Sequence, residues 1–214
     1  MDRHIRFDGP AGILEAVLHL PETSGPYPGV VVCHPHPLSG GEMTSNVVMA
    51  VCAGAYQRGI ATLRFNFRGV GASAGSHDRG AGEQDDVRAA LAFMACQEDI
   101  DPERIGLAGY SFGARVAIAV ADGAPQVQAI AAVSPPLRDA GALLATFTRP
   151  KLFLVGDEDR GIPADAVMAF AAGLPDPSEA RVVPGADHFW NGFEYFLAQF
   201  TGEFFARCLV REPG

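Results

Sequence analysis

The sequence predicts an α/β fold with a mostly parallel central sheet of about eight strands and helices on both faces. Short apolar runs that fit strands alternate along the chain with longer segments in which apolar residues recur at helical spacing. Several of the strand runs are apolar throughout, which is typical of strands buried on both faces of a parallel sheet. Strands that alternate with helices are joined by crossovers, and crossovers leave neighbouring strands parallel.

The chain opens with two predicted strands, 3–7 and 12–20, that a Gly-Pro turn joins as an antiparallel pair. The run 29–33 follows as the first strand of the buried type. The helices depend on periodicity, such as the apolar positions Val87 and Leu91 one helical turn apart. The later predicted strands are 60–65, 104–108, 127–133, 151–155 and 180–183, and the predicted helices are 44–57, 83–96, 112–121, 140–145, 164–172 and 192–208.

The chain of 214 residues, 48% of them hydrophobic, is long enough to bury a sizeable core without disulfides. Because no internal repeat, charge run or Ser/Gly linker interrupts it, residues 1–214 are predicted to form a single domain. The formal net charge of -9 argues against binding to nucleic acid, which needs clustered Lys and Arg, and against an anionic membrane surface.

The cysteines and the N-terminus favour a reducing compartment. No two of the four cysteines have CxxC spacing, and each lies among apolar neighbours, which predicts small buried hydrophobic residues. They are Cys33, Cys52, Cys96 and Cys208. The N-terminal residues are charged and lack the apolar region of a signal peptide, and no stretch of about 18 apolar residues exists. We therefore expect a cytoplasmic protein without a membrane span.

The pattern Gly-x-Ser-x-Gly occurs twice, at 71–75 and 109–113. It has a mechanical meaning only where a strand runs directly into it and a helix runs directly out, because that sharp turn exposes the serine oxygen at the carboxyl edge of a sheet. The second copy meets this condition, which predicts Ser111 as a nucleophile. The first copy is separated from its strand and no helical pattern follows it, so Ser73 is predicted to lie in a flexible loop.

In this context, Gly109–Gly113 resembles the nucleophile elbow of the α/β-hydrolase superfamily. Two further stretches, HPHPLSGG at 34–41 and RFNFRGVG at 64–71, resemble a bacterial group of small, uncapped α/β-hydrolases close to the dienelactone hydrolases. The resemblance extends from about Gly29 to the final helix and implies an α/β-hydrolase fold with little or no cap. Dienelactone hydrolases proper carry Cys at the elbow, where this chain has Ser111, so their substrate is not carried over.

A serine hydroxyl is a weak nucleophile until a base removes its proton, and histidine suits that task near neutral pH. The resemblance implies the order nucleophile, acid, histidine, and His188 is the only histidine after Ser111. It also implies an acid three residues after a glycine, with a proline four residues later, and Gly156 and Asp159 match that spacing. Asp159 is therefore the predicted acid that orients the histidine, with Asp157 as the alternative.

Acyl transfer places negative charge on the former carbonyl oxygen, and backbone N–H groups aimed at that oxygen stabilise it. One predicted donor is the N–H of Phe112, the residue after the nucleophile. The other is expected in the His-Pro-His-Pro-Leu loop after the strand 29–33, where the prolines have no N–H to donate. Matching this loop to the oxyanion turn of the family implies His36 as the second donor, with Leu38 as the alternative.

His34 and His36 also fit a metal-binding hypothesis, but the sequence offers no third ligand with suitable spacing. Neither a metal nor another cofactor is therefore predicted. His34 is expected to be a buried side chain that anchors its loop.

Two groups of residues near the predicted strand ends have two interpretations each. Arg64 and Arg68 either bind a carboxylate substrate or pair with nearby acids such as Asp85 or Asp86, and we expect the pairing. Three aromatic residues either line an acyl pocket or pack the last helix against the sheet: Phe189, Trp190 and Phe193.

Together these patterns predict a serine hydrolase that cleaves carboxylic esters in two steps, with a small-molecule acyl substrate as its partner. The stretch between 133 and 151 has room for one short helix but not for the lid that many relatives insert, so small or short-chain substrates are expected. Hydrolysis of thioesters, lactones or amides on the same residues stays as an alternative. So does a non-catalytic binding module with this fold.

Overall fold

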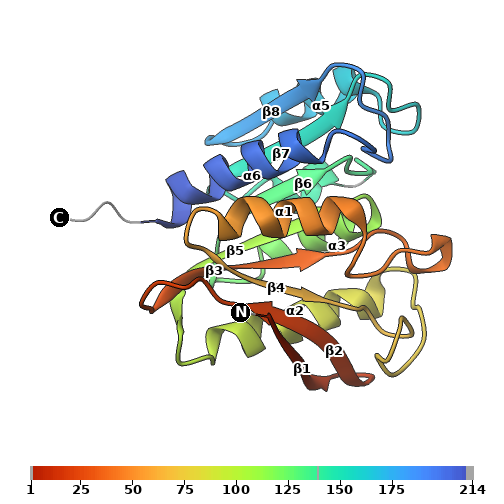
Figure 1. Ribbon diagram of the computed structural model, residues 1–214. Helices are drawn as coiled ribbons and strands as arrows, with labels where there is room; N and C mark the ends of the chain where they lie inside the picture. The colour runs from red at the N-terminus through yellow and green to blue at the C-terminus, as the bar shows by residue number, and fades with distance from the viewer. Residues whose placement is uncertain (1, 139, 211–214) are drawn as a thin grey trace.

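The computed structural model describes residues 2–138 and 140–210, and their centre is one eight-stranded sheet (Figure 1). The order of the strands across the sheet is β1-β2-β4-β3-β5-β6-β7-β8. In chain order they are β1 (Asp2–Gly9), β2 (Gly12–His19), β3 (Tyr27–Cys33), β4 (Ala61–Phe65), β5 (Ile100–Tyr110), β6 (Val127–Val133), β7 (Lys151–Gly156) and β8 (Ser178–Val183). The predicted α/β fold with a mostly parallel sheet is confirmed.

Only one end of the sheet is antiparallel. The hairpin of β1 and β2 adds to the edge of β4, and the strands from β4 to β8 all run parallel to one another. In the parallel part, helices return the chain to the start of the next strand. The carboxyl ends of β3 to β8 therefore meet at one edge of the sheet, where ligand sites of such folds lie.

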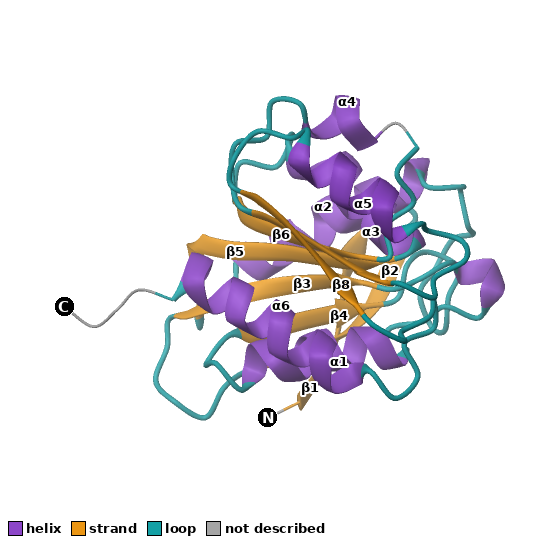
Figure 2. Cartoon of the chain, turned by 90° about the horizontal axis from the view of Figure 1, so that it is seen from above, coloured by secondary structure: helices purple, strands orange, loops and turns teal. Residues whose placement is uncertain are grey.

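Helices cover both faces of the sheet. They are α1 (Asn46–Tyr56), α2 (Ala81–Ala95), α3 (Phe112–Ala121), α4 (Ala140–Leu144), α5 (Ala164–Ala172) and α6 (Glu194–Leu209), with a short 3-10 helix, η1, at Pro37–Ser39. Figure 2 shows α1 and α6 on one face and the other α-helices on the opposite face. The buried apolar side chains divide accordingly into two clusters, one on each side of the sheet.

The ends of the predicted elements agree with the structure within two residues except at the start of β5, and two further differences concern η1 and one cysteine. β5 begins at Ile100 instead of 104, because Ile100 already pairs with Tyr27 before an irregularity in the ladder. The unpredicted η1 forms where Pro37 occupies the first turn and His36 caps it. Cys96 is exposed at the end of α2, so the prediction that every cysteine is buried is wrong for this residue.

Little chain stands above the carboxyl edge of the sheet. Between β6 and β7, the described residues 134–138 and 140–150 contain one helix, the five-residue α4. The prediction of little or no cap is therefore confirmed. In the described part of the chain, no helix has both the length and the apolar character needed to span a membrane.

Candidate active site

Ser111 lies at the sharp turn between β5 and α3. Its φ of 52° and ψ of -115° are unusual for a residue with a side chain, and such strain is typical of functional turns. Both glycines of the pattern are needed here: a Cβ on Gly109 would lie 2.4 Å from the carbonyl oxygen of Gly113, and one on Gly113 would lie 2.4 Å from that of His34. The turn meets the strand–turn–helix condition that distinguished this serine in the sequence.

Ser111, His188 and Asp159, remote in the sequence, form one chain of hydrogen bonds. Oγ of Ser111 lies 3.1 Å from Nε2 of His188, and Nδ1 of His188 lies 2.8 Å from Oδ2 of Asp159. The second oxygen of Asp159 accepts the N–H groups of Gly161 and Ile162, each at 3.0 Å. Since Nδ1–H donates to the buried carboxylate, Nε2 is free to accept the serine proton. The structure thus brings together the three residues predicted for this chemistry.

The neighbouring carboxylates serve the backbone instead. Oδ1 of Asp157 accepts the N–H of Gly185 at 2.6 Å, which ties the loop after β7 to the loop after β8. Oδ1 of Asp187 accepts the N–H of Phe189 at 2.9 Å, inside the histidine loop itself. Between the two acids considered from the sequence, the geometry favours Asp159.

The loop 188–190 is held by three hydrogen bonds that the sequence did not indicate. The hydroxyl of Tyr110 donates to the carbonyl oxygen of His188 at 2.6 Å, and Nδ2 of Asn46 donates to that of Phe189 at 2.9 Å. The buried Nε1–H of Trp190 donates to Oγ of Ser134 at 3.1 Å. Burial raises the pKa of Tyr110 to about 12, so its hydroxyl stays a donor. No local sequence signal indicates these bonds, because each joins segments far apart in the chain.

The two predicted oxyanion donors are neighbours. The rings of His36 and Phe112 have centroids 4.9 Å apart, and in the described part of the chain neither backbone N–H has a protein acceptor. The N–H of Leu38, in contrast, donates to Nδ1 of His36 at 3.2 Å. Burial, together with the nearby His77 and Arg115, lowers the pKa of His36, which suits this acceptor role of its ring. The geometry favours His36 over Leu38 as the second donor.

His34 anchors the same loop from beneath. Nδ1 of its fully buried ring donates to the carbonyl oxygen of Pro35 at 2.7 Å, and Nε2 accepts the N–H of Phe67 at 3.0 Å. Burial lowers the pKa of His34 to about 4, so the ring is neutral at physiological pH. Both nitrogens are occupied by backbone groups, as expected for a side chain that anchors the loop. Among the described residues, no group of three or more His, Cys, Asp or Glu is arranged to hold a metal ion.

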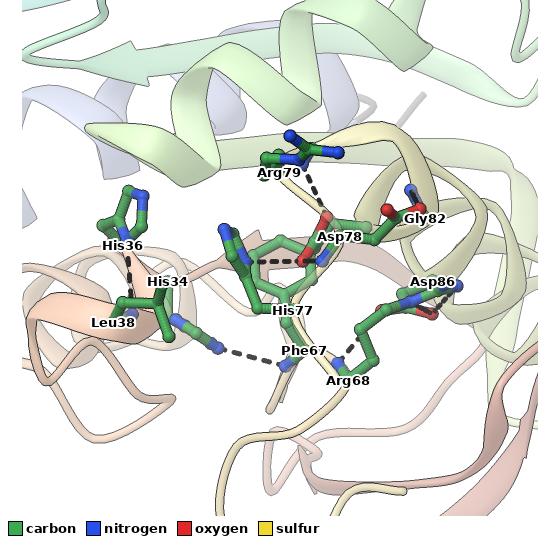
Figure 3. A network of polar contacts seen from close by, with 12 residues as sticks. His34, His36, Leu38, Phe67, Arg68, His77, Asp78, Arg79, Gly82 and Asp86 are labelled. Carbon is green, nitrogen blue, oxygen red and sulfur yellow. Dashed lines mark hydrogen bonds and ion pairs between the residues drawn. The ribbon is translucent and has the colours of Figure 1, made fainter. Parts of the chain in front are cut away.

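Figure 3 shows the polar network of the segment that follows β4. Nη2 of Arg68 donates to Oδ1 of the fully buried Asp86 at 2.7 Å, and the backbone N–H of Arg68 donates to Oδ2 at 3.0 Å. The pairing expected for this arginine is therefore confirmed. Arg64 behaves differently, because its nearest carboxylate is that of Asp2, at 3.7 Å. The expectation that Arg64 pairs with the acids of α2 is wrong, since its side chain points to the face of the sheet that α1 covers.

The same network supports the loop after β3, which carries the predicted donor His36. Both oxygens of the buried Glu83 accept backbone N–H groups, from Asp78 at 2.8 Å and from Gly80 at 2.7 Å. Nδ1 of His77 lies 2.7 Å from Oε1 of Glu83, and the His77 ring lies 5.0 Å from that of His36 between centroids. The segment after β4 thus packs against His36 and Phe112, the residues that carry the predicted donors.

Ser73, in the first copy of the pattern, is buried. Its Oγ donates to the carbonyl oxygen of Asn66 at 2.7 Å and accepts the N–H of Glu15 at 3.0 Å. The prediction of a flexible loop serine is corrected: this serine joins its loop to β2. No ring nitrogen or carboxylate contacts its hydroxyl in the described structure, unlike that of Ser111.

A cleft of about 450 Å³ opens over Ser111 between the loop after β3 and the histidine loop. Of the three aromatic residues considered from the sequence, Phe189 lines this cleft and is 63% exposed. Trp190 is fully buried under α6, and Phe193 packs against the same core cluster. The remaining lining residues are mostly small or polar: Pro35, His36, Ser39, Gly40, Gly41, Ser45, Asn46, Tyr110, Ser111, His188 and Asn191.

Comparison with known proteins places this site in a family context. Residues 14–191 match the model of the dienelactone hydrolase family. An uncharacterized protein of Rickettsia prowazekii is 34% identical over 206 residues, which cover 92% of this chain and 84% of that protein.

Two solved structures share the fold over nearly their whole length. The first is a Xanthomonas campestris protein described as an α/β serine hydrolase without lid, at 31% identity and a TM-score of 0.85, covering 99% of this chain and 97% of that one. The second is an α/β serine hydrolase homologue from Coxiella burnetii, at 35% identity and a TM-score of 0.85, covering 94% and 96%. Both agree with a lidless α/β-hydrolase fold.

Proposed function

The chain belongs to the dienelactone hydrolase family and is a hydrolase, and from that premise we propose that it is a serine hydrolase that cleaves small or short-chain carboxylic esters. The observation that carries the proposal is the hydrogen-bonded chain from Ser111 through His188 to Asp159, with distances of 3.1 and 2.8 Å. Such a chain activates a serine hydroxyl that is otherwise a weak nucleophile near neutral pH.

In the first step, Nε2 of His188 takes the proton of Ser111 while Oγ attacks the carbonyl carbon of the ester. The C=O electron pair moves to oxygen and gives a tetrahedral intermediate. Its collapse breaks the bond to the alkoxy group, which leaves as an alcohol after accepting the proton from His188. The acyl group is then bound to Ser111 as an ester.

In the second step, His188 takes a proton from water, and the resulting hydroxide equivalent attacks the acyl carbon. The bond to Oγ breaks, Oγ recovers the proton from His188, and the carboxylic acid departs. In both steps Asp159 keeps Nδ1–H in place and stabilises the positive charge on the imidazolium. The two backbone N–H groups on Asp159 prevent that carboxylate from turning away.

The oxyanion of both intermediates would bind to the N–H groups of Phe112 and His36. Phe112 is the first residue of α3, so the positive end of the helix dipole adds to its N–H. In the described structure, the N–H groups of Phe112 and His36 have no protein acceptor, which supports their role as oxyanion donors. Donors that are already free and in position need no reorganisation during the reaction.

The substrate range follows from the open cleft. With a volume of about 450 Å³ and α4 as the only helix between β6 and β7 in the described chain, the site suits short acyl groups more than long chains. Thioesters, lactones and amides can undergo the same attack, and they remain alternative substrates.

A fluorophosphonate probe and a panel of acyl substrates test the proposal. We expect covalent labelling of Ser111 in the folded protein and faster hydrolysis of acetyl and butyryl esters than of long-chain esters. Peptide mapping locates the label, and heat-denatured protein is the control for non-specific reaction. Absence of label at Ser111 would instead favour a binding module, and faster turnover of thioesters, lactones or amides would reassign the substrate class.

A further inference from the structure

A second cavity lies beneath α1, at the antiparallel end of the sheet. Its volume is about 230 Å³, and it has no lining residue in common with the cleft over Ser111. It is lined from α1 by Met49, Cys52, Ala53 and Tyr56 and from the sheet by Asp2, His19, Thr62 and Arg64.

The strand register explains why polar side chains meet there. Asp2 of β1 pairs with His19 of β2, and His19 pairs with Thr62 of β4, so the three form one row across the sheet. Arg64 lies two residues after Thr62 and therefore on the same face. The next strand continues that row with Val30, an apolar residue of the kind expected under a helix. The polar row is thus a local exception on an otherwise apolar face.

Three polar atoms of this row are buried without a hydrogen-bond partner in the described structure: Nε of Arg64, Oγ1 of Thr62 and Nε2 of His19. Arg64 is 8% exposed and Thr62 1%, so neither group is open to bulk solvent. The hydroxyl of Thr62 also lies within reach of the thiol of Cys52, which is a weak hydrogen-bond partner. Buried polar groups are normally satisfied, so three unsatisfied atoms around one cavity indicate an occupant with hydrogen-bonding atoms.

The charges around the cavity restrict that occupant. Nδ1 of His19 is hydrogen-bonded to Asp2, and this bond lowers the pKa of Asp2, so the carboxylate is ionised. Nη2 of Arg64 lies 3.7 Å from the same carboxylate. A cation would face the guanidinium, and a dianion such as phosphate would face the Asp2 carboxylate. A monoanion with two acceptor oxygens matches the two free donors, Nε–H of Arg64 and O–H of Thr62.

We propose that this cavity binds a small monocarboxylate, with one oxygen on Nε–H of Arg64 and the other on the hydroxyl of Thr62. The third atom without a hydrogen-bond partner, Nε2 of His19, belongs to a residue that lines the same cavity. The groups that face the His19 ring are Asp2 from β1, Thr62 and Arg64 from β4, and Tyr56 from α1, whose ring centroid lies 4.2 Å away. The short apolar part of the ligand contacts Met49 and Ala53 at the mouth.

This site is independent of the proposed hydrolysis. Helix α1 separates the two: its first residue, Asn46, lines the catalytic cleft, and the later residues Met49, Cys52, Ala53 and Tyr56 line the cavity. Replacing the nucleophile should therefore leave carboxylate binding intact. Loss of esterase activity and loss of binding are separable outcomes.

Ligand-observed ¹⁹F NMR tests the proposal with trifluoroacetate as the probe and trifluoroacetamide as its neutral match. We expect saturable broadening of the trifluoroacetate signal and little effect on the amide. Ala53→Phe, at an exposed helix position, fills the mouth and leaves every polar group in place, and Arg64→Gln removes the charge. Both variants should weaken trifluoroacetate binding roughly tenfold or more, and Ser111→Ala should not change it.

Circular dichroism and thermal unfolding establish that each variant is folded, and Ala53→Phe keeps the test decisive if Arg64→Gln does not fold. Equal binding of acid and amide, unchanged binding in Ala53→Phe, or no saturation through the millimolar range would overturn the proposal. A crystal soaked in trifluoroacetate provides the direct view. Density for the anion between Arg64 and Thr62 supports the site, and ordered water alone at that position refutes it.

Discussion

The two Gly-x-Ser-x-Gly segments of this chain share a sequence pattern but differ in backbone conformation and in the hydrogen bonds of the serine. At 109–113 the serine has a φ of 52°, lies directly between β5 and α3, and its Oγ lies 3.1 Å from an imidazole nitrogen. At 71–75 the serine lies in a loop, and its Oγ is shared between the backbone of Asn66 and that of Glu15. The hydroxyl of Ser111 faces a histidine at the edge of a cleft, and the hydroxyl of Ser73 is hydrogen-bonded to the backbone and stabilises the fold.

The difference shows that the pattern acquires chemical meaning from the elements on either side. A Cβ added at 109 or 113 would lie 2.4 Å from a backbone carbonyl oxygen, whereas the glycines at 71 and 75 have φ of 56° and 83° and serve loop turns. The Ser73 hydroxyl donates its only proton to a backbone carbonyl oxygen, and in the described structure no base is placed to remove that proton. The following changes test this contrast, beginning with the largest expected effect.

Ser111→Ala should lower kcat by about 10⁵-fold or more, because among the described cleft residues only the hydroxyl of Ser111 is hydrogen-bonded to a histidine nitrogen. The free energy of unfolding should change little, since the strained backbone turn is retained. Steady-state hydrolysis of a short-chain ester and urea unfolding measure the two effects. Residual activity close to that of the wild type would mean that the nucleophile lies elsewhere.

Asp159→Asn should lower kcat by about 10⁴-fold, because the amide favours the wrong tautomer of His188 and does not stabilise the imidazolium. Asp157→Asn is the matched control: its side chain caps the N–H of Gly185 and does not face the ring, so kcat should change by no more than about threefold. The same ester assay compares both variants. A larger loss in Asp157→Asn would reverse the assignment of the acid.

Much of this contrast was predictable from local sequence. Strand–turn–helix context alone separated Ser111 from Ser73. The alternating apolar runs predicted the order of strands and helices along the chain and the mostly parallel sheet. The three site residues also lie in loops after predicted strands, which is why parallel topology brings them to one edge. Their catalytic roles, the single-domain organisation and the cytoplasmic location stay predictions.

The parts that could not be predicted depend on pairs of residues far apart in the chain. The bond from Tyr110 to the carbonyl of His188 joins positions 78 residues apart, and that from Asn46 to Phe189 joins positions 143 apart. Arg64 was assigned to the wrong partner because the hairpin of β1 and β2 brings Asp2 beside it, and only strand register determines that neighbour. The periodicity of apolar residues predicts which face of a helix or strand a side chain occupies, but it does not predict which residue of another segment lies next to it.

His34 joins the loop after β3 to the segment that leads to Ser73, because its ring is hydrogen-bonded to the carbonyl oxygen of Pro35 and to the N–H of Phe67. Its pKa is about 4 in the folded state against 6.5 for the free side chain, so the unfolded chain binds more protons between these values. Stability should therefore fall as the pH drops through this window, by about 2 kcal/mol between pH 7 and pH 5 from this residue.

His34→Gln cannot titrate and retains an acceptor for the Phe67 N–H, which makes it the matched variant for the pH effect. Urea unfolding at both pH values should show a decrease in the free energy of unfolding about 2 kcal/mol smaller in the variant than in the wild type. An equal decrease in both proteins would show that His34 is not held neutral by the fold.

Tyr110→Phe removes only the hydroxyl that donates to the carbonyl oxygen of His188, and we expect kcat to fall about tenfold with KM nearly unchanged. The reason is looser positioning of the imidazole, not loss of a reacting group. Tyr195→Phe, on an exposed side chain of α6, is a control that should leave both constants unchanged. A rise in KM alone would indicate instead that Tyr110 binds the substrate.

Ser73→Ala should have the smallest effect, and one of a different kind from Ser111→Ala. It leaves the N–H of Glu15 and the carbonyl oxygen of Asn66 without their shared partner, which should lower the free energy of unfolding by about 1 kcal/mol. Because neither backbone group lines the cleft over Ser111, kcat/KM should stay within about twofold of the wild-type value. Urea unfolding and the ester assay on the same preparation separate the two quantities. A fall in kcat/KM well beyond twofold in folded protein would mean that the first copy of the pattern contributes to the reaction. Both serines would then affect catalysis, and they would differ only in how much.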